Sequence, residues 1–207
     1  MQNALRYGIL GGTFDPPHLG HLVLAQEAYI QLNLDKVWFV PAGQPPHKTG
    51  QEISPAEVRS TLVALAIEGD ERFGLCKVEL ERTGPSYSVD TLRELRSVWG
   101  ADAWVCLILG WDMLASLATW HDPAGLVEQV DRIAASPRPG SRLQPDEVDH
   151  LEKEVPGLRR KLEVLHVPQI DISATALRQR VAATQPIRYL VPSTICDYIA
   201  ERNLYRS

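Results

Sequence analysis

Short apolar runs alternate with amphipathic segments along the chain, and this alternation is the main structural signal in the sequence. Between the runs, apolar residues recur at helical spacing, for example over residues 22–32. Strands that alternate with helices predict a parallel sheet covered on both faces, because crossover helices pack against it. The sequence therefore predicts an α/β fold with a single doubly wound parallel sheet. The strand-length runs lie at residues 5–10, 36–40, 73–81, 104–109, 132–135 and 162–167.

Boundary residues locate two of the helices between these runs. The sequence SPAE at residues 54–57 has the serine, proline and glutamate of a capping box, which predicts a helix that continues to about residue 68. A second helix is predicted over residues 88–99, and Gly100 ends it. Three prolines between residues 136 and 146 predict a loop.

The stretch GGTFDPPHLGH, residues 11–21, joins the first strand to the first helix. Asp15 is expected to cap that helix, and Pro16 suits its first turn because proline lacks the N–H that is unpaired there. The free N–H groups and the positive end of the helix dipole would then face an anion. Gly20 has no side chain, so a ligand could approach the backbone closely. The stretch indicates phosphate chemistry.

Two histidines accompany this predicted anion site. His18 and His21 are three residues apart, so they share one helical face. A dinucleotide redox site would need G-x-G-x-x-G, whereas only Gly11 and Gly12 occur here. A metal site could use Asp15 with the two histidines, but Asp15 is expected to act as the cap, and two histidines alone make a poor closed site.

Composition narrows the range of partners and compartments. The chain has 207 residues, of which 44% are hydrophobic, which suits one well-buried domain over residues 1–207 with a small C-terminal helical part from about residue 173. Lys and Arg number 21 against 26 Asp and Glu, a net charge of -5 that argues against nucleic acid as a partner. Three separated cysteines indicate buried thiols. No signal peptide or membrane-spanning run is evident, so we expect a cytoplasmic protein with no membrane partner.

A second motif, ISATALR, lies at residues 172–178. Ser173 is expected to cap a helix, and Arg178 can fold back towards the N-terminus from which Thr175 donates. An arginine, hydroxyl groups and a helix dipole would thus converge on an anion. In an open parallel sheet, such sites lie beyond the carboxyl ends of the strands, where the loops 41–48, 82–88, 110–112 and 136–140 are also expected.

These two motifs carry a family resemblance. The stretch at residues 11–21 resembles the H-x-G-H signature of the nucleotidyltransferase superfamily that also includes class I aminoacyl-tRNA synthetases, and ISATALR resembles the I-S-x-T-x-[IL]-R motif of its adenylyltransferase branch. With PSYSVDTL at residues 85–92, GWD at 110–112 and TW at 119–120, the chain is similar over nearly its whole length to the bacterial nicotinate-mononucleotide adenylyltransferases.

The resemblance implies a Rossmann-like nucleotidyltransferase fold and a reaction. AMP would pass from ATP to nicotinate mononucleotide, giving deamido-NAD and pyrophosphate in NAD biosynthesis, with Mg²⁺ held by the ATP phosphates and no metal ligands from the protein. The implied catalytic residues are His18, His21, Lys48 and Arg178. The implied ATP-binding residues are Gly11, Gly12, Thr13, Phe14, His18, His21, Gly110, Asp112, Arg138, Ile172, Ser173, Thr175 and Arg178. The implied acceptor-binding residues are His47, Lys48, Tyr87, Ser88, Asp112, Trp120 and His121.

The implied chemistry needs no side-chain nucleophile, because the acceptor phosphate attacks the α-phosphorus of ATP in line. At least one of His18 and His21 is expected to be an imidazolium if bound phosphates raise its pKa. Trp120 would stack on the pyridine ring, and N–H groups at the start of the helix at residue 88 would bind the carboxylate.

Two positions depart from the family pattern, and three questions stay open. His121 stands where relatives often carry tyrosine, and residues 136–140 have serine and proline where an arginine pair is frequent. The alternative functions are a sister adenylyltransferase that uses nicotinamide mononucleotide or phosphopantetheine, and a nucleotide-binding regulator without catalysis. The oligomeric state also stays open.

Overall fold

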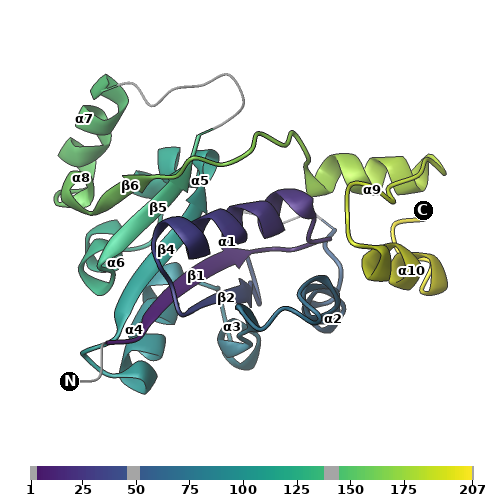
Figure 1. Ribbon diagram of the computed structural model, residues 1–207, viewed down its shortest axis with the longest axis horizontal. Coiled ribbons are helices and arrows are strands. Elements are labelled where there is room, and N and C mark those ends of the chain that lie inside the picture. Colours follow the sequence, from purple (N-terminus) through teal and green to yellow (C-terminus); the bar gives the residue numbers. More distant parts are fainter. Residues whose placement is uncertain (1–3, 46–51, 138–144, 207) are drawn as a thin grey trace.

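A computed structural model describes residues 4–45, 52–137 and 145–206. Six parallel strands form one sheet in the order β3-β2-β1-β4-β5-β6 (Figure 1). The strand order reverses between β1 and β4, which is where ligands bind in such sheets. The predicted α/β fold with a doubly wound parallel sheet is confirmed. The strands are β1 (Arg6–Gly12), β2 (Lys36–Pro41), β3 (Phe73–Leu75), β4 (Trp104–Gly110), β5 (Arg132–Ser136) and β6 (Leu162–Val164).

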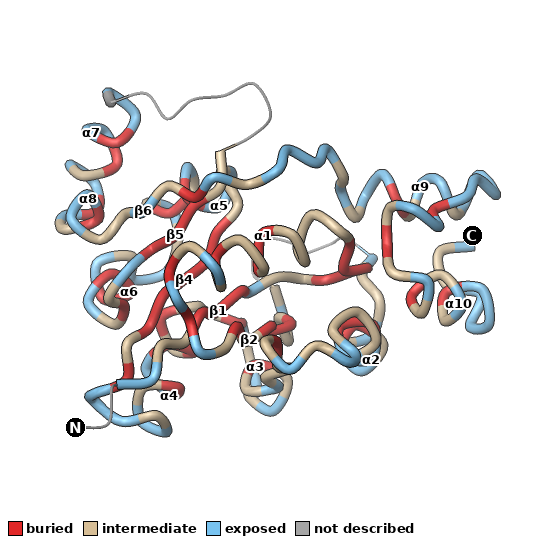
Figure 2. The backbone as a smooth tube through the Cα atoms, in the orientation of Figure 1, coloured by how far each residue is buried: buried red, intermediate tan, exposed pale blue. Residues whose placement is uncertain are grey.

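Helices cover both faces of this sheet. Side chains of β4 alternate between two cores. Val105, Leu107 and Leu109 pack with α4 (Ser88–Trp99) and α6 (Pro123–Gln129), whereas Cys106 and Ile108 pack with α1 (Leu19–Gln31). Figure 2 shows the buried residues concentrated along the strands and on the inner sides of these helices. The helices are α1 (Leu19–Gln31), α2 (Ala56–Ala66), α3 (Val78–Glu81), α4 (Ser88–Trp99), α5 (Trp111–Ala115), α6 (Pro123–Gln129), α7 (Pro145–Glu154), α8 (Leu158–Lys161), α9 (Ala174–Ala182) and α10 (Ser193–Glu201), with a 3₁₀ turn η2 (Leu117–Thr119).

A third, smaller core lies at the C-terminal end. There α9 and α10 pack with α2 through apolar residues, and Figure 1 places these helices together at one end of the molecule. The Ser173 hydroxyl accepts a hydrogen bond from the N–H of Ala176, so the predicted cap of α9 is confirmed. The assignment of residues 1–207 to one domain stays a prediction. The core residues are Leu62, Leu177, Ile187, Val191, Ile195 and Ile199.

Three predicted elements differ from the structure. The run at residues 73–81 is not one strand: β3 ends at Leu75, and α3 follows it. Charged and apolar residues alternate over residues 77–81 as they would in a strand, but the Glu79 carboxylate is buried and accepts a hydrogen bond from the Thr91 hydroxyl. The run at 162–167 pairs as β6 only to Val164, and the predicted loop at 136–146 gives way to α7 at Pro145.

The helix at SPAE begins one residue later than its capping-box pattern predicts. Pro55 occupies the N-cap position of α2 and makes no side-chain cap hydrogen bond. The Ser54 N–H instead donates to the Asp15 carboxylate at 3.1 Å, so a tertiary contact replaces the local one. By contrast, the predicted helix at 88–99 is confirmed as α4, with Gly100 at its C-cap at φ 86°.

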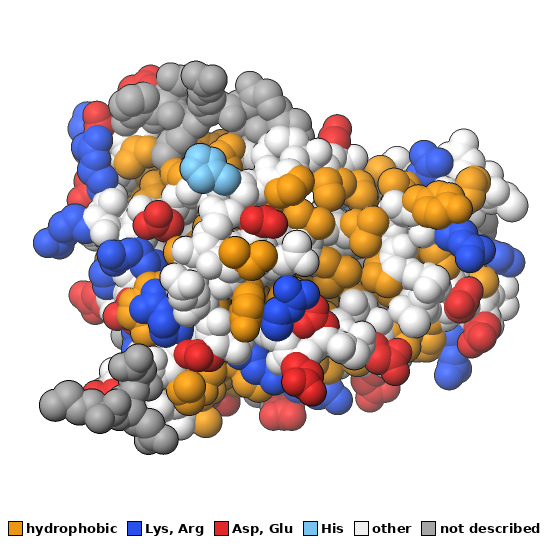
Figure 3. Space-filling model, viewed as in Figure 1, with side chains coloured by type: hydrophobic (Ala, Val, Ile, Leu, Met, Phe, Trp, Pro, Cys, Tyr) orange, Lys and Arg blue, Asp and Glu red, His pale blue; other side chains and the backbone are white. Residues whose placement is uncertain are grey.

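Two surface properties complete the description. On the face in Figure 3, Lys and Arg side chains are interspersed with Asp and Glu, so the described residues form no extended basic surface there. Within residues 4–45, 52–137 and 145–206, no helix is both long and apolar enough to cross a membrane.

Candidate active site

The site begins at the carboxyl ends of β1 and β4, where the strand order reverses. A Cβ added at Gly11 or at Gly110 would meet no atom within 4 Å, so both positions leave open space at the switch point. Gly12 is tighter, because a Cβ there would lie 3.0 Å from the Phe14 ring. Phe14 is buried with φ 51° and packs its ring against His21. Gly11 and Gly12 are the last two residues of β1 and form no turn after it, and the open space at Gly11 leaves room for a ligand beside the strand end.

His18 and His21 lie together at the start of α1. Their rings stack with centroids 3.8 Å apart, and the His18 N–H donates to His21 Nδ1 at 3.2 Å. Since Nδ1 of His21 accepts, its ring proton is on Nε2, which leaves Nε2–H as the donor. A Cβ at Gly20 would lie 3.0 Å from His18 Nδ1, so Gly20 makes room for the His18 ring.

Both imidazoles are neutral near pH 7 in the protein without ligand. Burial lowers the pKa of His18 to about 4. Burial, together with the neighbouring His18, lowers the pKa of His21 well below its usual value. The expected imidazolium is thus not favoured until a bound phosphate raises a pKa. His18 Nδ1 is buried without a hydrogen-bond partner among the described residues, so a ligand donor could satisfy it.

The backbone at the start of α1 is less open to an anion than the sequence suggested. The Leu19 N–H donates to the Leu190 carbonyl at 3.1 Å, and the N–H groups of His21 and Leu22 donate to the His18 carbonyl. These three donors are engaged within the protein. The imidazole nitrogens are therefore more suitable phosphate donors here than the helix end.

Asp15 does not cap α1, and this prediction is wrong. The N-cap residue is His18, and Pro16 and Pro17 separate Asp15 from it. Asp15 is only 1% exposed, and its carboxylate accepts from the Ser54 N–H at 3.1 Å and from the Tyr205 hydroxyl at 2.6 Å. The carboxylate therefore joins three segments that are distant in the sequence.

Arg178 reaches the same loop from α9. Its Nη1 donates to the Asp15 carbonyl at 2.8 Å, and its Nη2 lies 3.5 Å from the Thr175 hydroxyl. The two sequence motifs, at residues 11–21 and 172–178, are thus in direct contact. Ile172 and Ser173 precede the first turn of α9.

A cavity of about 660 Å³ lies beside this contact. It does not include His18, His21 or the glycines of the switch point, so it is separate from the carboxyl ends of β1 and β4. The cavity instead lies between Arg178 and the C-terminal residues Tyr205 and Arg206. The lining residues are Asp15, Glu52, Ile53, Ser54, Arg178, Gln179, Ala182, Tyr205 and Arg206.

Arg59 is a site residue that the sequence analysis missed. It is 1% exposed, and its guanidinium donates to the carbonyls of Thr13, Gly43 and Ser54 at 2.9, 3.1 and 3.0 Å. It therefore holds the loops after β1 and β2 against the start of α2. An arginine between apolar positions on one face of a predicted helix was the available signal.

The predicted acceptor residues gather at the start of α4 and after η2. The rings of Tyr87 and His121 stack with centroids 4.2 Å apart, and Trp120 donates from Nε1 to the Ser116 hydroxyl at 3.3 Å. Tyr87 is the N-cap of α4 and Ser88 is its first residue. Asp112 lies in the first turn of α5, directly after β4.

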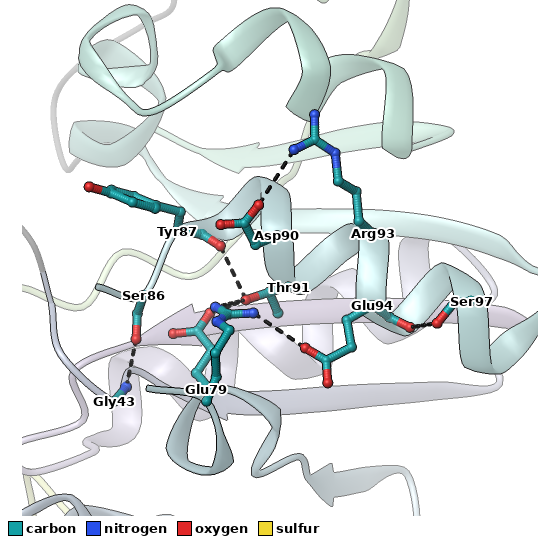
Figure 4. A network of polar contacts seen from close by, with 10 residues as sticks. Gly43, Glu79, Ser86, Tyr87, Asp90, Thr91, Arg93, Glu94 and Ser97 are labelled. Carbon is teal, nitrogen blue, oxygen red and sulfur yellow. Dashed lines mark hydrogen bonds and ion pairs between the residues drawn. The ribbon is translucent and has the colours of Figure 1, made fainter. Parts of the chain in front are cut away.

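A polar network supports the loop that leads into α4 (Figure 4). The Ser86 hydroxyl accepts from the N–H groups of Gly43 and Gln44 at 2.9 and 3.1 Å, which ties this loop to the end of β2. Behind it, the Thr91 hydroxyl donates to the buried Glu79 carboxylate at 2.7 Å. Burial raises the pKa of Glu79, which favours its neutral form. Glu79 was given no role from the sequence.

Some predicted residues cannot be placed in this arrangement. His47, Lys48 and Arg138 lie outside the described residues. Within the part of the chain that the structure describes, no three or more His, Cys, Asp or Glu side chains form a group that could hold a metal ion.

Comparisons with known proteins agree with this architecture. The profile of the cytidylyltransferase-like family matches residues 9–180. A probable nicotinate-nucleotide adenylyltransferase of Dehalococcoides mccartyi is 43% identical over 98% of both chains, and one of Thermomicrobium roseum is 40% identical over 98% of this chain and 92% of its own. The fold is similar to that of Plasmodium falciparum nicotinic acid mononucleotide adenylyltransferase complexed with NaAD, with a TM-score of 0.77, 19% identity and 97% coverage of both chains. The chain therefore belongs to the cytidylyltransferase-like family and, within it, to the nicotinate-nucleotide adenylyltransferases.

Proposed function

We propose that this protein transfers AMP from ATP to nicotinate mononucleotide, giving deamido-NAD and pyrophosphate in NAD biosynthesis. The observation that carries this proposal is the His18–His21 pair, stacked at the start of α1 beside the switch point of the sheet and linked through the 13–18 loop to Arg178. The names of relatives that are about 40% identical over nearly the whole chain support the choice of acceptor.

The reaction follows from alignment of two phosphates. The acceptor phosphate attacks the α-phosphorus of ATP in line, and the bond to the pyrophosphate breaks, so no covalent enzyme intermediate is needed. His21 donates from Nε2 to a phosphate oxygen on which charge develops, and the neighbouring His18 ring is a second donor to the phosphates. Arg178 and Lys48 are proposed to neutralise the charge of the departing pyrophosphate. Gly11, Gly12, Thr13, Phe14, Gly110, Asp112, Arg138, Ile172, Ser173 and Thr175 are proposed to bind ATP.

Nucleotidyltransferases of this kind use a divalent metal with ATP, and we propose Mg²⁺. The described site residues nearest the proposed phosphates present imidazole and guanidinium nitrogens, which fits an ion held chiefly by phosphate oxygens. When bound, the ion would neutralise charge on the phosphates. His18, His21 and Arg178 are the residues proposed to align the ATP phosphates with the acceptor phosphate.

The acceptor is proposed to bind between the β4 loop and α4. Trp120 provides a stacking plane for the pyridine ring, and Tyr87 and His121 form an adjacent aromatic pair. N–H groups in the first turn of α4 bind the carboxylate, and Ser88 begins that turn. His47, Lys48 and Asp112 complete the proposed acceptor site. Because both substrates are metabolites of the cytoplasm, we propose that the protein acts there.

The test is an assay of pyrophosphate release by the purified protein with ATP and Mg²⁺. Nicotinate mononucleotide, nicotinamide mononucleotide and phosphopantetheine are compared as acceptors, and the dinucleotide product is identified by mass. We expect rapid release with nicotinate mononucleotide. Faster release with either other acceptor would identify a sister adenylyltransferase, and ATP binding without release would identify a regulator.

A further inference from the structure

The Asp15 carboxylate is buried between segments that lie 39 and 190 residues away in the sequence. One oxygen accepts from the Ser54 N–H at 3.1 Å, and the other accepts from the Tyr205 hydroxyl at 2.6 Å. Arg59 also attracts Asp15, whose charge opposes the lowering of the Arg59 pKa by burial. A buried carboxylate depends on such donors, and an O–H···O⁻ bond is among the stronger ones.

The backbone of the same residue holds Arg178. Its carbonyl accepts from Arg178 Nη1 at 2.8 Å. Tyr205 and Arg178 belong to one packed unit, because Leu177, Ile199 and Tyr205 share the small C-terminal core. This unit therefore donates hydrogen bonds to Asp15 at two points, the carboxylate and the carbonyl. His18 follows Asp15 by three residues.

From this two-point contact we propose that Tyr205 is a positioning residue for AMP transfer, which sets the place of Arg178 relative to the His18–His21 pair through Asp15. The proposal rests on the proposed function for its kinetic consequence. It assigns Tyr205 no contact with substrate.

Three further observations indicate that the surroundings hold Tyr205 in place. Tyr205 has φ 61°, a left-handed conformation that non-glycine residues adopt only when their surroundings enforce it. Burial and the Asp15 carboxylate raise the pKa of Tyr205, so its hydroxyl stays a donor at neutral pH. The 660 Å³ cavity borders Asp15, Arg178 and Tyr205, so water could reach the carboxylate if the hydroxyl were removed.

The test compares Tyr205→Phe with Tyr198→Phe. Tyr198 is a matched control, since it lies in the same C-terminal core and its ring faces Arg202 rather than the loop at Asp15. For Tyr205→Phe we expect kcat/KM for ATP to fall about tenfold or more, because a small displacement of a positioned group is costly. The KM for nicotinate mononucleotide should not change, and Tyr198→Phe should match the wild type.

A double-mutant cycle with Arg178→Ala separates positioning from folding. If Tyr205 acts through Arg178, the loss in kcat/KM from Tyr205→Phe should largely disappear when Arg178 is already absent. Thermal unfolding verifies that each variant is folded at the assay temperature. Additive losses, or a lower Tm with unchanged ATP kinetics, would overturn the proposal.

Calorimetry of ATP binding gives a readout that needs no acceptor. We expect ATP affinity to fall about tenfold in Tyr205→Phe and to be unchanged in Tyr198→Phe, whereas equal affinities of Tyr205→Phe and wild type would contradict the proposal. A wild type that binds ATP but does not use nicotinate mononucleotide would refute the proposed function alone, because the binding comparison still tests Tyr205.

Discussion

At the scale of single residues, His18 and His21 act as a pair because one determines the proton position of the other. The His18 N–H donates to Nδ1 of His21, which leaves Nε2–H as the donor that we propose faces the phosphates. We predict that His18→Ala or His21→Ala lowers kcat by roughly a hundredfold or more, the usual effect of losing one preorganised donor. Pyrophosphate release and circular dichroism measure activity and fold. A folded variant with nearly full activity would exclude the pair from the mechanism.

The burial of His18 also predicts how stability depends on pH. Its pKa is about 4 when folded and near 6.5 when unfolded, so the unfolded chain binds the extra proton first. Above pH 6.5 the histidine is neutral in both states, so it does not change the free energy of unfolding. As the pH is lowered from 6.5 to 4, the unfolded chain gains the proton first and the free energy of unfolding falls. The loss for this group is on the order of 3 kcal/mol at most.

Urea unfolding of wild type and His18→Gln across that pH range measures the effect. The difference between the two proteins removes contributions from other groups. We expect the variant to lose less stability on acidification. Parallel curves would show that His18 is not buried in a neutral form.

Another residue-scale prediction contrasts two glycines. A Cβ at Gly43 would overlap the Glu79 carbonyl, whereas a Cβ at Gly11 would meet nothing within 4 Å. Gly43→Ala should therefore destabilise the fold by roughly 1 to 3 kcal/mol, the usual cost of overpacking. Gly11→Ala should leave Tm nearly unchanged and weaken ATP binding, because its methyl group enters the proposed nucleotide space. Reversed effects on Tm would contradict the geometry at both loops.

At the scale of elements, α9 presents Arg178 to the loop before α1. We predict that Arg178→Ala weakens ATP binding and turnover with little change in acceptor binding, since α9 faces the proposed leaving group. Titration calorimetry with ATP and with nicotinate mononucleotide measures the two affinities separately. An unchanged ATP affinity together with unchanged turnover would make Arg178 a structural residue only.

Elements that depend on local rules were predictable from the sequence. Gly100 ends α4 and Ser173 caps α9, because each effect acts within one helical turn. Asp15 was assigned by the same rule and is wrong, because its partners lie 39 and 190 residues away. Arg59 was missed for a related reason: the three carbonyls that it binds converge only in the folded chain.

At the scale of the whole molecule, the proposed acceptor site combines α4, the β4 loop and the turn after η2. N–H groups at a helix start prefer a carboxylate to an amide, since charge-assisted hydrogen bonds are about twice as strong as neutral ones. We predict a preference for the mononucleotide of nicotinate over that of nicotinamide of at least about a hundredfold in kcat/KM. Trp120→Ala should weaken both by roughly 1 to 3 kcal/mol, because stacking does not distinguish the substituents.

Steady-state kinetics with both acceptors, for wild type and Trp120→Ala, test the two parts of this prediction separately. Equal use of acid and amide by the wild type would exclude an acid-specific site. A Trp120→Ala variant that loses one acceptor selectively would show that the indole contacts the ring substituent.

The hydrogen bond between Tyr205 and Asp15 has a consequence for synthesis on the ribosome. The chain emerges from its N-terminus, so β1 and the two histidines leave the exit tunnel long before Tyr205 does. A nascent chain can pair its first strands, yet the Asp15 carboxylate still lacks the Tyr205 hydroxyl as a hydrogen-bond donor. A message interrupted before the Tyr205 codon would accordingly encode a polypeptide in which Ser54 and Arg59 can hold the loop before the histidines but the Tyr205 hydroxyl cannot.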